Sequence, residues 1–217
     1  MISATKQKPL EEILQSLNGC EKVYIIGCGT CTTMLHTGGK TEVLAMKEKL
    51  EAAGKKVSGW MVIPTACDDL TKDALEESTA EIGASDCILI MACAYGVQTV
   101  GLFTGKAIYP AQNTIFIGRQ DTPGQFIELC AQCGNCVLAR TGGICPVARC
   151  AKSLFNGPCG GSVGGKCEID PNIPCAWQLI IDRMASLGQL DRLETIEPAK
   201  DWSTSLSGGP RRITIEI

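Results

Sequence analysis

The stretch YIIGCGTCTTMLHTGGKTE, residues 24–42, decides the fold class. An apolar run ends there in a glycine-rich turn, and a helix-like pattern follows the turn. A strand that leads through a turn into a helix is the building unit of parallel α/β sheets. The turn also carries Cys28 and Cys31. The stretch therefore raises the question of whether a nucleotide phosphate or a metal binds there.

Both phosphate-binding patterns are incomplete in this stretch. The dinucleotide fingerprint G-x-G-x-x-G is matched by Gly27 and Gly29, but Thr32 occupies its third position. The P-loop pattern G-x-x-x-x-G-K-[ST] is matched at its end by residues 39–41, but Met34 occupies the position of its first glycine. The two cysteines are therefore the stronger indication, and they favour a metal.

The rest of residues 1–124 alternates between strand-like and helix-like patterns. Strands are expected at KVYIIG, VSGWMVI, DCILIMA and NTIFIGR. Helices are expected at PLEEILQSLNG, at about 41–53, at TKDALEESTAEIG and at VQTVGLFTG. The alternation predicts a doubly wound, mostly parallel four-stranded α/β sheet of flavodoxin or Rossmann type, for which we consider the strand order 2-1-3-4.

The chain changes character after this α/β domain of residues 1–124. Residues 130–175 hold eight cysteines among many glycines and show little periodicity. We therefore expect a small Cys-rich module over 125–192, which ends in a helix at about 176–187, and a C-terminal tail over 193–217.

Composition limits the function classes. The net charge is −3 and there is no long basic run, so we expect no nucleic-acid partner. No apolar stretch reaches the ~20 residues that cross a membrane, and the N-terminal residues lack a secretory pattern. We therefore expect a cytoplasmic protein, in which 14 cysteines indicate metal binding or redox chemistry rather than disulfides.

Four cysteines follow the ends of the first three predicted strands. Cys28 and Cys31 follow the first strand, Cys67 follows the second and Cys93 closes the third. Ligands of open parallel sheets bind outside the carboxyl ends of the strands. In the order 2-1-3-4 these three ends are neighbours, so the four thiols are expected to converge on one edge.

The spacing of these strand ends bears on the metal group. Tetrahedral zinc brings its sulfurs within about 3.8 Å of one another, whereas three neighbouring strand ends span roughly 10 Å. We therefore expect a [4Fe–4S] cluster at this edge, with zinc and a bare redox dithiol as alternatives.

Three residues near these strands are left out of the site. Cys20 and Cys87 precede their strands, so we expect them at the opposite edge as buried thiols. His36, the only histidine, is expected to be a surface or packing residue, with contact to the cluster or to an incoming partner as the alternative.

The Cys-rich module carries a ferredoxin-like pattern. Cys130, Cys133 and Cys136 have the C-x2-C-x2-C spacing of [4Fe–4S] ligation, and Cys145 precedes a proline. Eight residues separate Cys136 from Cys145, against three in the compact ferredoxin run, so the fourth ligand stays open. The other candidates for it are Cys150, Cys159, Cys167 and Cys175.

Twelve cysteines remain when Cys20 and Cys87 are set aside, which is enough for three metal sites with four cysteine ligands each. We expect two [4Fe–4S] clusters and a third site with zinc or a further [4Fe–4S] cluster. The candidate metal ligands are Cys28, Cys31, Cys67, Cys93, Cys130, Cys133, Cys136, Cys145, Cys150, Cys159, Cys167 and Cys175.

Several segments together resemble one known family. They are GCGTC, HTGG, ACDD, AYGVQTV, CAQCGNCVLARTGGICPVARCAKSLFNGPCGG, GKCEIDP and CAWQLIIDRM. Over roughly residues 8–205 the chain resembles MetV, the small iron–sulfur subunit of acetogen-type methylenetetrahydrofolate reductase, and also the C-terminal extension of some one-chain reductases. The resemblance implies an iron–sulfur protein, sometimes with zinc, of one-carbon metabolism and the Wood–Ljungdahl pathway.

The resemblance also implies a partner. That partner is an FMN-containing TIM barrel that reduces methylenetetrahydrofolate to methyltetrahydrofolate, and this chain is its non-flavin subunit. The chain itself shows no evident acid–base machinery, which agrees with a carrier role. We expect it to pass electrons to the partner's flavin from a donor such as a ferredoxin, a heterodisulfide-reductase-like module or an NADH-oxidising module.

Two alternatives to electron transfer remain open. One is a zinc-stabilised scaffold that organises a flavoprotein without carrying electrons, and the other is an independent enzyme or sensor that uses Cys28 and Cys31 as a dithiol. The helix after Cys175 and the tail segment RRITIEI are candidate docking elements. Core packing is the alternative for that helix, and a loose terminus is the alternative for the tail.

Overall fold

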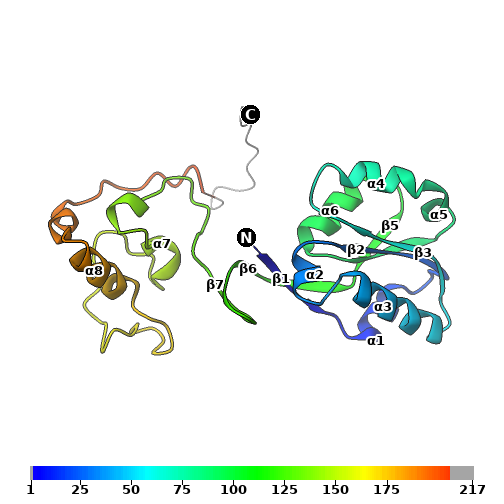
Figure 1. Cartoon of the computed structure of the whole chain (residues 1–217), viewed down its shortest axis with the longest axis horizontal. Helices are drawn as coiled ribbons and strands as arrows, with labels where there is room; N and C mark the ends of the chain where they lie inside the picture. The colour runs from blue at the N-terminus through cyan, green and yellow to red at the C-terminus, as the bar shows by residue number, and fades with distance from the viewer. Residues whose placement is uncertain (1, 206–217) are drawn as a thin grey trace. The chain divides into compact units, whose positions relative to one another are not determined.

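The structure of the chain is a computed structural model that describes residues 2–205. Its contacts divide the chain into unit 1, Met1–Ile117, and unit 2, Gly118–Ile217 (Figure 1). Unit 1 contains a sheet covered by helices, and unit 2 contains mostly loops and short helices. Among residues 2–205 no helix is both long enough and apolar enough to cross a membrane.

The main sheet of unit 1 is parallel, with four strands in the order β3-β2-β4-β5. The strands are β2 (Lys22–Cys28), β3 (Lys56–Ile63), β4 (Cys87–Met91) and β5 (Ala107–Pro110). The predicted α/β class is confirmed. The first predicted strand does lie between the second and the third.

Helices cover both faces of this sheet because its central strands are apolar on both sides. Val23 and Ile25 of β2 pack in one core with α1 and α3, while Tyr24 and Ile26 pack in a second core with α4, α5 and α6 (Figure 1). The helices are α1 (Leu10–Ser16), α3 (Lys40–Ala52), α4 (Thr71–Glu77), α5 (Thr79–Gly83) and α6 (Ala94–Phe103).

The fourth strand of the parallel sheet was predicted at the wrong place. The segment NTIFIGR does form a strand, but it belongs to β6 (Gln112–Thr122), which lies outside the parallel sheet. The fourth parallel strand is β5, which has four residues and ends in a proline. A run that short carries too little pattern to be recognised as a strand.

The helix predicted at residues 71–83 is split into α4 and α5 at Ser78. The hydroxyl of Thr79 donates hydrogen bonds to the carbonyls of Leu75 and Glu76, at 3.4 and 2.7 Å. Serine and threonine hydroxyls compete in this way with the backbone hydrogen bonds that continue a helix.

A second sheet has the strand order β1-β6-β7, with β1 at Ile2–Gln7 and β7 at Gln125–Ile127. The β6–β7 pair is antiparallel, and Gly124 has a φ of +79° in the turn between them. The strand β1 was not predicted. Its sequence, ISATKQ, has only one large apolar residue, Ile2, which is too few to mark a strand.

The described part of unit 2, up to residue 205, has one small apolar core. Its elements are η1 (Leu138–Arg140), α7 (Pro146–Arg149), α8 (Ala176–Ser186) and η2 (Leu190–Glu194). Trp177, Ile180 and Met184 of α8 are buried together, and the Trp177 indole N–H donates a 2.7 Å hydrogen bond to the Leu154 carbonyl. The predicted helix is thus confirmed, and its apolar face packs in the core of unit 2. The segment RRITIEI lies outside the described residues.

Candidate metal centres

The carboxyl ends of three strands lie level at one edge of the sheet in unit 1. Cys28, the last residue of β2, is paired with Ile63, the last residue of β3. Its neighbour Gly27 is paired with Met91, the last residue of β4. These pairings set the positions from which the four candidate cysteines follow.

The four candidate cysteines of unit 1 all lie at this edge. Cys31 begins the short helix α2 (Cys31–Met34), which follows β2. Cys67 lies in the turn between β3 and α4, and Cys93 precedes α6. Cys28 and Cys93 are buried, Cys31 is half-buried, and Cys67 is exposed to solvent.

Cys28, Cys31 and Cys93 are close enough to affect the ionisation of the Cys67 thiol. Partial burial raises the pKa of the Cys67 thiol, and the negative charges of Cys93, Cys28 and Cys31 raise it further. Thiolates that repel one another in this way are stabilised by a cationic group placed between them. The donor set therefore fits a metal group with thiolate ligands.

The loop that carries Cys28 and Cys31 is held by backbone contacts. The Cys28 amide donates to the Gly38 carbonyl at 3.1 Å, and the hydroxyls of Thr32 and Thr33 donate to the Cys28 carbonyl at 3.1 and 2.7 Å. A Cβ atom on Gly38 would overlap the Met91 carbonyl oxygen. Gly38, in the HTGG segment, is thus needed because the loop lies directly on the end of β4.

The N-terminus of α3 is occupied by a side chain of the protein. Gly39 caps this helix, and its amide donates to a carboxylate oxygen of Glu42 at 2.9 Å. The exposed His36 places its Nδ1 atom 3.9 Å from the other oxygen of Glu42. A negative side chain thus lies where a P-loop holds its phosphate, which agrees with the incomplete P-loop pattern.

Cys20 and Cys87 lie at the amino edge of the sheet, as predicted. Cys87 begins β4 opposite Val23 of β2, and both thiols are buried. Burial and a hydrogen bond with Cys20 raise the pKa of the Cys87 thiol far above its ordinary value. Both thiols are part of the main apolar core.

Four cysteines of unit 2 line one small cavity. The cavity has a volume of about 20 Å³, and Trp177 of α8 forms part of its wall. Lys152 and Glu168, which also line it, form an ion pair. The four cysteines are Cys150, Cys159, Cys167 and Cys175.

Backbone amides point at two of these sulfurs. Cys159 accepts a hydrogen bond from the Gly161 amide at 3.4 Å. Burial alone would raise the pKa of Cys175, which caps α8, but hydrogen bonds from the amides of Gln178 and Trp177 and from the Ser162 hydroxyl outweigh burial and lower that pKa. Such hydrogen bonds stabilise a thiolate, which is the form that binds metal.

The ferredoxin-like run forms a turned loop with similar contacts. The Gln132 amide donates to the Cys130 sulfur at 3.3 Å, and Gln132 has a φ of +51°. The Cys145 sulfur caps α7 and accepts from the Ala148 amide at 3.5 Å.

The segment at residues 200–205 fastens this loop, and sequence analysis did not reveal its role. The Thr204 hydroxyl donates to the Cys133 carbonyl at 2.8 Å, and the Lys200 ammonium donates to the Asn135 carbonyl. These polar contacts join residues about 70 positions apart, and no local pattern indicates them.

The thiols approach one another without meeting at a point. Within residues 2–205, no three cysteine, histidine or carboxylate side chains are close enough to hold a single metal ion as they stand. The candidate centres are therefore defined in three ways: by the cysteines at one edge of the sheet, by those that line one cavity, and by the spacing of the ferredoxin-like run.

Comparison with known proteins bears on the second half of the chain. Residues 109–203 match a family model described as "Methylene-tetrahydrofolate reductase C terminal", and this match contains all eight cysteines of the Cys-rich module. Neither the curated proteins nor the solved structures gave a match. Through residues 109–203, the chain is related to proteins of the methylenetetrahydrofolate reductase type.

Proposed function

We propose that this chain is an iron–sulfur electron-transfer subunit, of the MetV kind, of a methylenetetrahydrofolate reductase. It passes reducing equivalents to an FMN-containing partner, which reduces methylenetetrahydrofolate to methyltetrahydrofolate. The observation that carries the proposal is the family match at residues 109–203, which joins a reductase-related segment to eight clustered cysteines.

A first [4Fe–4S] cluster is proposed at the carboxyl edge of the sheet in unit 1. Its ligands are Cys28, Cys31, Cys67 and Cys93. The observation in support is that β2, β3 and β4 are adjacent and end at one edge of the sheet, where all four cysteines lie. Such a cluster supplies one-electron chemistry when it is bound. The protein keeps Cys28 and Cys93 away from solvent and leaves Cys67 exposed.

The shared cavity supports a division of the eight cysteines of unit 2 into two sites. Cys150, Cys159, Cys167 and Cys175 line one cavity and are assigned to one site. The ferredoxin-like run is then completed by Cys145, which is assigned by exclusion. The second [4Fe–4S] site is therefore proposed at Cys130, Cys133, Cys136 and Cys145.

Zinc is proposed at the site lined by Cys150, Cys159, Cys167 and Cys175. A cavity needs a volume of about 10–15 Å³ to hold one water molecule. The cavity between these cysteines has a volume of about 20 Å³. That space is enough for a single ion, and a further [4Fe–4S] cluster is the alternative at this site. Four-thiolate zinc sites are typical fasteners of modules with small cores.

The folate chemistry is assigned to the partner. Reduction of FMN takes two electrons and two protons, so a one-electron donor must deliver two electrons for each turnover. The electrons come from a donor protein such as a ferredoxin, a heterodisulfide-reductase-like module or an NADH-oxidising module. The single histidine of this chain is exposed and lies beside Glu42.

The proposal is tested by reducing the full chain without oxygen and mixing it with the FMN-containing reductase polypeptide of the same organism. We expect the flavin absorbance to bleach at a rate that depends on the concentration of this chain. The matched control is the same chain with its metals removed, which should leave the flavin oxidised. Equal bleaching rates with the intact and metal-free chains would contradict the proposal.

A zinc-stabilised scaffold is the second candidate function. The small cavity lined by four cysteines favours it, because a site of that kind stabilises a fold without carrying electrons. A scaffold would raise the reductase activity through binding alone. It would leave the flavin oxidised in the mixing experiment.

A further inference from the structure

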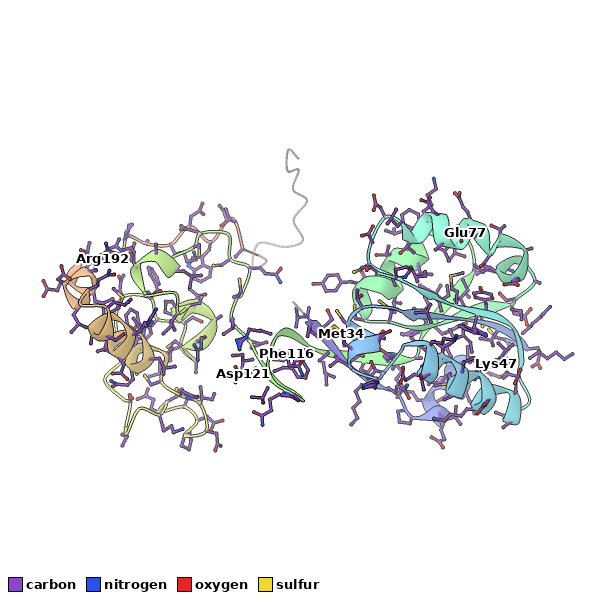
Figure 2. All side chains as sticks on the ribbon, viewed as in Figure 1. Met34, Lys47, Glu77, Phe116, Asp121 and Arg192 are labelled. Atoms are coloured by element: carbon purple, nitrogen blue, oxygen red, sulfur yellow. The ribbon has the colours of Figure 1, made fainter. Side chains whose placement is uncertain are left out.

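Three large apolar side chains are exposed beside the candidate cluster site in unit 1. Met34, at the end of α2, is 60% exposed, Leu70 before α4 is 66% exposed, and Tyr95 of α6 is 49% exposed (Figure 2 labels Met34). Each follows a candidate ligand by two or three residues. We call Met34, Leu70 and Tyr95 the edge patch.

The edge patch lies on three neighbouring connections of one sheet edge. Met34 follows β2, Leu70 follows β3 and Tyr95 follows β4, and these three strands are adjacent in the sheet. Single exposed apolar residues are ordinary on protein surfaces. Apolar residues gathered around one site indicate an interaction surface, and Met and Tyr are enriched at the centres of interfaces.

Acidic groups lie at the rim of the edge patch. Asp68 and Asp69 directly follow the exposed Cys67. Close by in the sequence, α4 adds further carboxylates, among them Asp73 and Glu77. A partner that covers the patch must therefore carry basic residues opposite this rim.

The position of Cys67 indicates which class of partner fits. Cys67 is the exposed member of the four candidate ligands, so the proposed cluster comes nearest to solvent at the edge patch. Electrons pass between proteins only where two redox centres approach closely. A surface that combines an apolar centre, a charged rim and the exposed side of a redox site fits a redox protein.

We propose that the edge patch is the surface on which the FMN-containing reductase docks, with basic residues of that flavoprotein opposite Asp68 and Asp69. The inference rests on the proposed function and goes beyond it, because it assigns the site of unit 1, and not that of unit 2, to face the flavin.

The experiment measures the binding of the full, metal-loaded chain to the FMN-containing reductase polypeptide without oxygen. The test variant is the double substitution Leu70→Ser and Tyr95→Ser, which removes apolar surface from the patch. The matched control is Leu102→Ser, because Leu102 is 80% exposed and lies near the C-terminal end of the same helix as Tyr95. Iron content and circular dichroism of each variant confirm that the fold and metals are retained.

We expect the double variant to weaken binding by at least about tenfold, as for residues at the centre of an interface. The control should bind like the unmodified chain. The substitutions Asp68→Lys and Asp69→Lys reverse the charge of the rim. They should slow association and make the association rate depend less on salt concentration. Binding within about twofold of the unmodified chain in all variants would overturn the docking assignment.

Two further outcomes separate this inference from the proposed function. If the unmodified chain binds the flavoprotein but its reduced form does not bleach the flavin, the electron-transfer function fails while the docking surface stands. If the double variant binds and bleaches the flavin like the unmodified chain, the docking surface fails while the function stands. If the unmodified chain does not bind the flavoprotein, both are contradicted.

Discussion

Gly38 illustrates how single residues shape the site of unit 1. It has no room for a side chain, because its backbone lies against the carbonyl of Met91 at the end of β4. The same carbonyl lies two residues before Cys93, and the Gly38 carbonyl accepts from the amide of Cys28. One glycine thus sets the distance between the connections that carry two of the candidate ligands.

The substitution Gly38→Ala should therefore disturb the first site. The added methyl group must push the loop away from β4, and overpacking of this kind costs about 1–3 kcal/mol. We expect a lower unfolding temperature and loss of iron from unit 1, with the metals of unit 2 retained. Gly83→Ala is the control, because a Cβ atom there meets no atom within 4 Å. Equal metal content and stability in the two variants would refute this role of Gly38.

The cysteines of unit 1 give a second prediction at this scale. Cys67→Ser and Cys93→Ser should each remove about four irons, the content of one cubane cluster. Cys87→Ser should leave the iron content unchanged, because Cys87 lies at the amino edge of the sheet. Iron and sulfide analysis of the three purified variants checks this. Loss of iron in Cys87→Ser but not in Cys93→Ser would contradict the assignment.

At the scale of elements, apolar periodicity predicted the strands and helices that have strong patterns. The runs KVYIIG, VSGWMVI and DCILIMA became β2, β3 and β4 because they are long and buried by helices on both faces. The pattern failed where elements are short or polar, as in β1 and β5. Their places depend on long-range pairing, which periodicity does not contain.

The candidate sites show the same division between local and long-range information. The edge of four cysteines in unit 1 followed from the strand order, because parallel strands end at one edge. The grouping of Cys150, Cys159, Cys167 and Cys175 did not follow from spacing. Irregular loops join these four residues, so only the folded chain shows that they line one cavity.

Asp86 gives a prediction at the scale of elements. It precedes β4, and its carboxylate accepts hydrogen bonds from the amides of Lys22 and Glu21 at 2.8 and 2.9 Å, which ties the start of β2 to β4. These hydrogen bonds lower the pKa of Asp86 from its ordinary value of 3.8. Because its pKa is lower in the folded state, the ionised carboxylate stabilises the fold at pH values above 3.8. This stabilisation is lost as the pH falls through the lowered pKa.

The substitution Asp86→Ala should therefore lower the unfolding temperature at pH 7, and the difference from the unmodified chain should shrink below about pH 4. Glu77→Ala is the control, since Glu77 is an exposed carboxylate at the end of α4 (Figure 2). Thermal unfolding across this pH range is the measurement. A destabilisation that does not change with pH would show that the charge of Asp86 has no part in it.

At the scale of the whole molecule, the two units differ in what holds them together. Unit 1 has two apolar cores, one on each face of its sheet. Unit 2 has a core of three buried residues of α8 and the residues packed on them. A core that small rarely stabilises a fold without metals or other cross-links.

Removal of metal should therefore unfold unit 2 and leave the sheet of unit 1 folded. After treatment with a strong chelator, we expect the amides of α8 to exchange with deuterated water within seconds. The amides of β2 and β4 should remain protected. Hydrogen exchange read by mass spectrometry compares the two units in one sample. Protection of α8 that survives complete metal removal would contradict this account of unit 2.

The most direct test of the central claim is the content of iron, acid-labile sulfide and zinc per chain after purification without oxygen. Two cubane clusters and one four-thiolate zinc site predict about eight irons, about eight sulfides and about one zinc. About twelve irons would make the third site a cluster as well. Zinc without iron would contradict the electron-transfer function and leave the scaffold in its place.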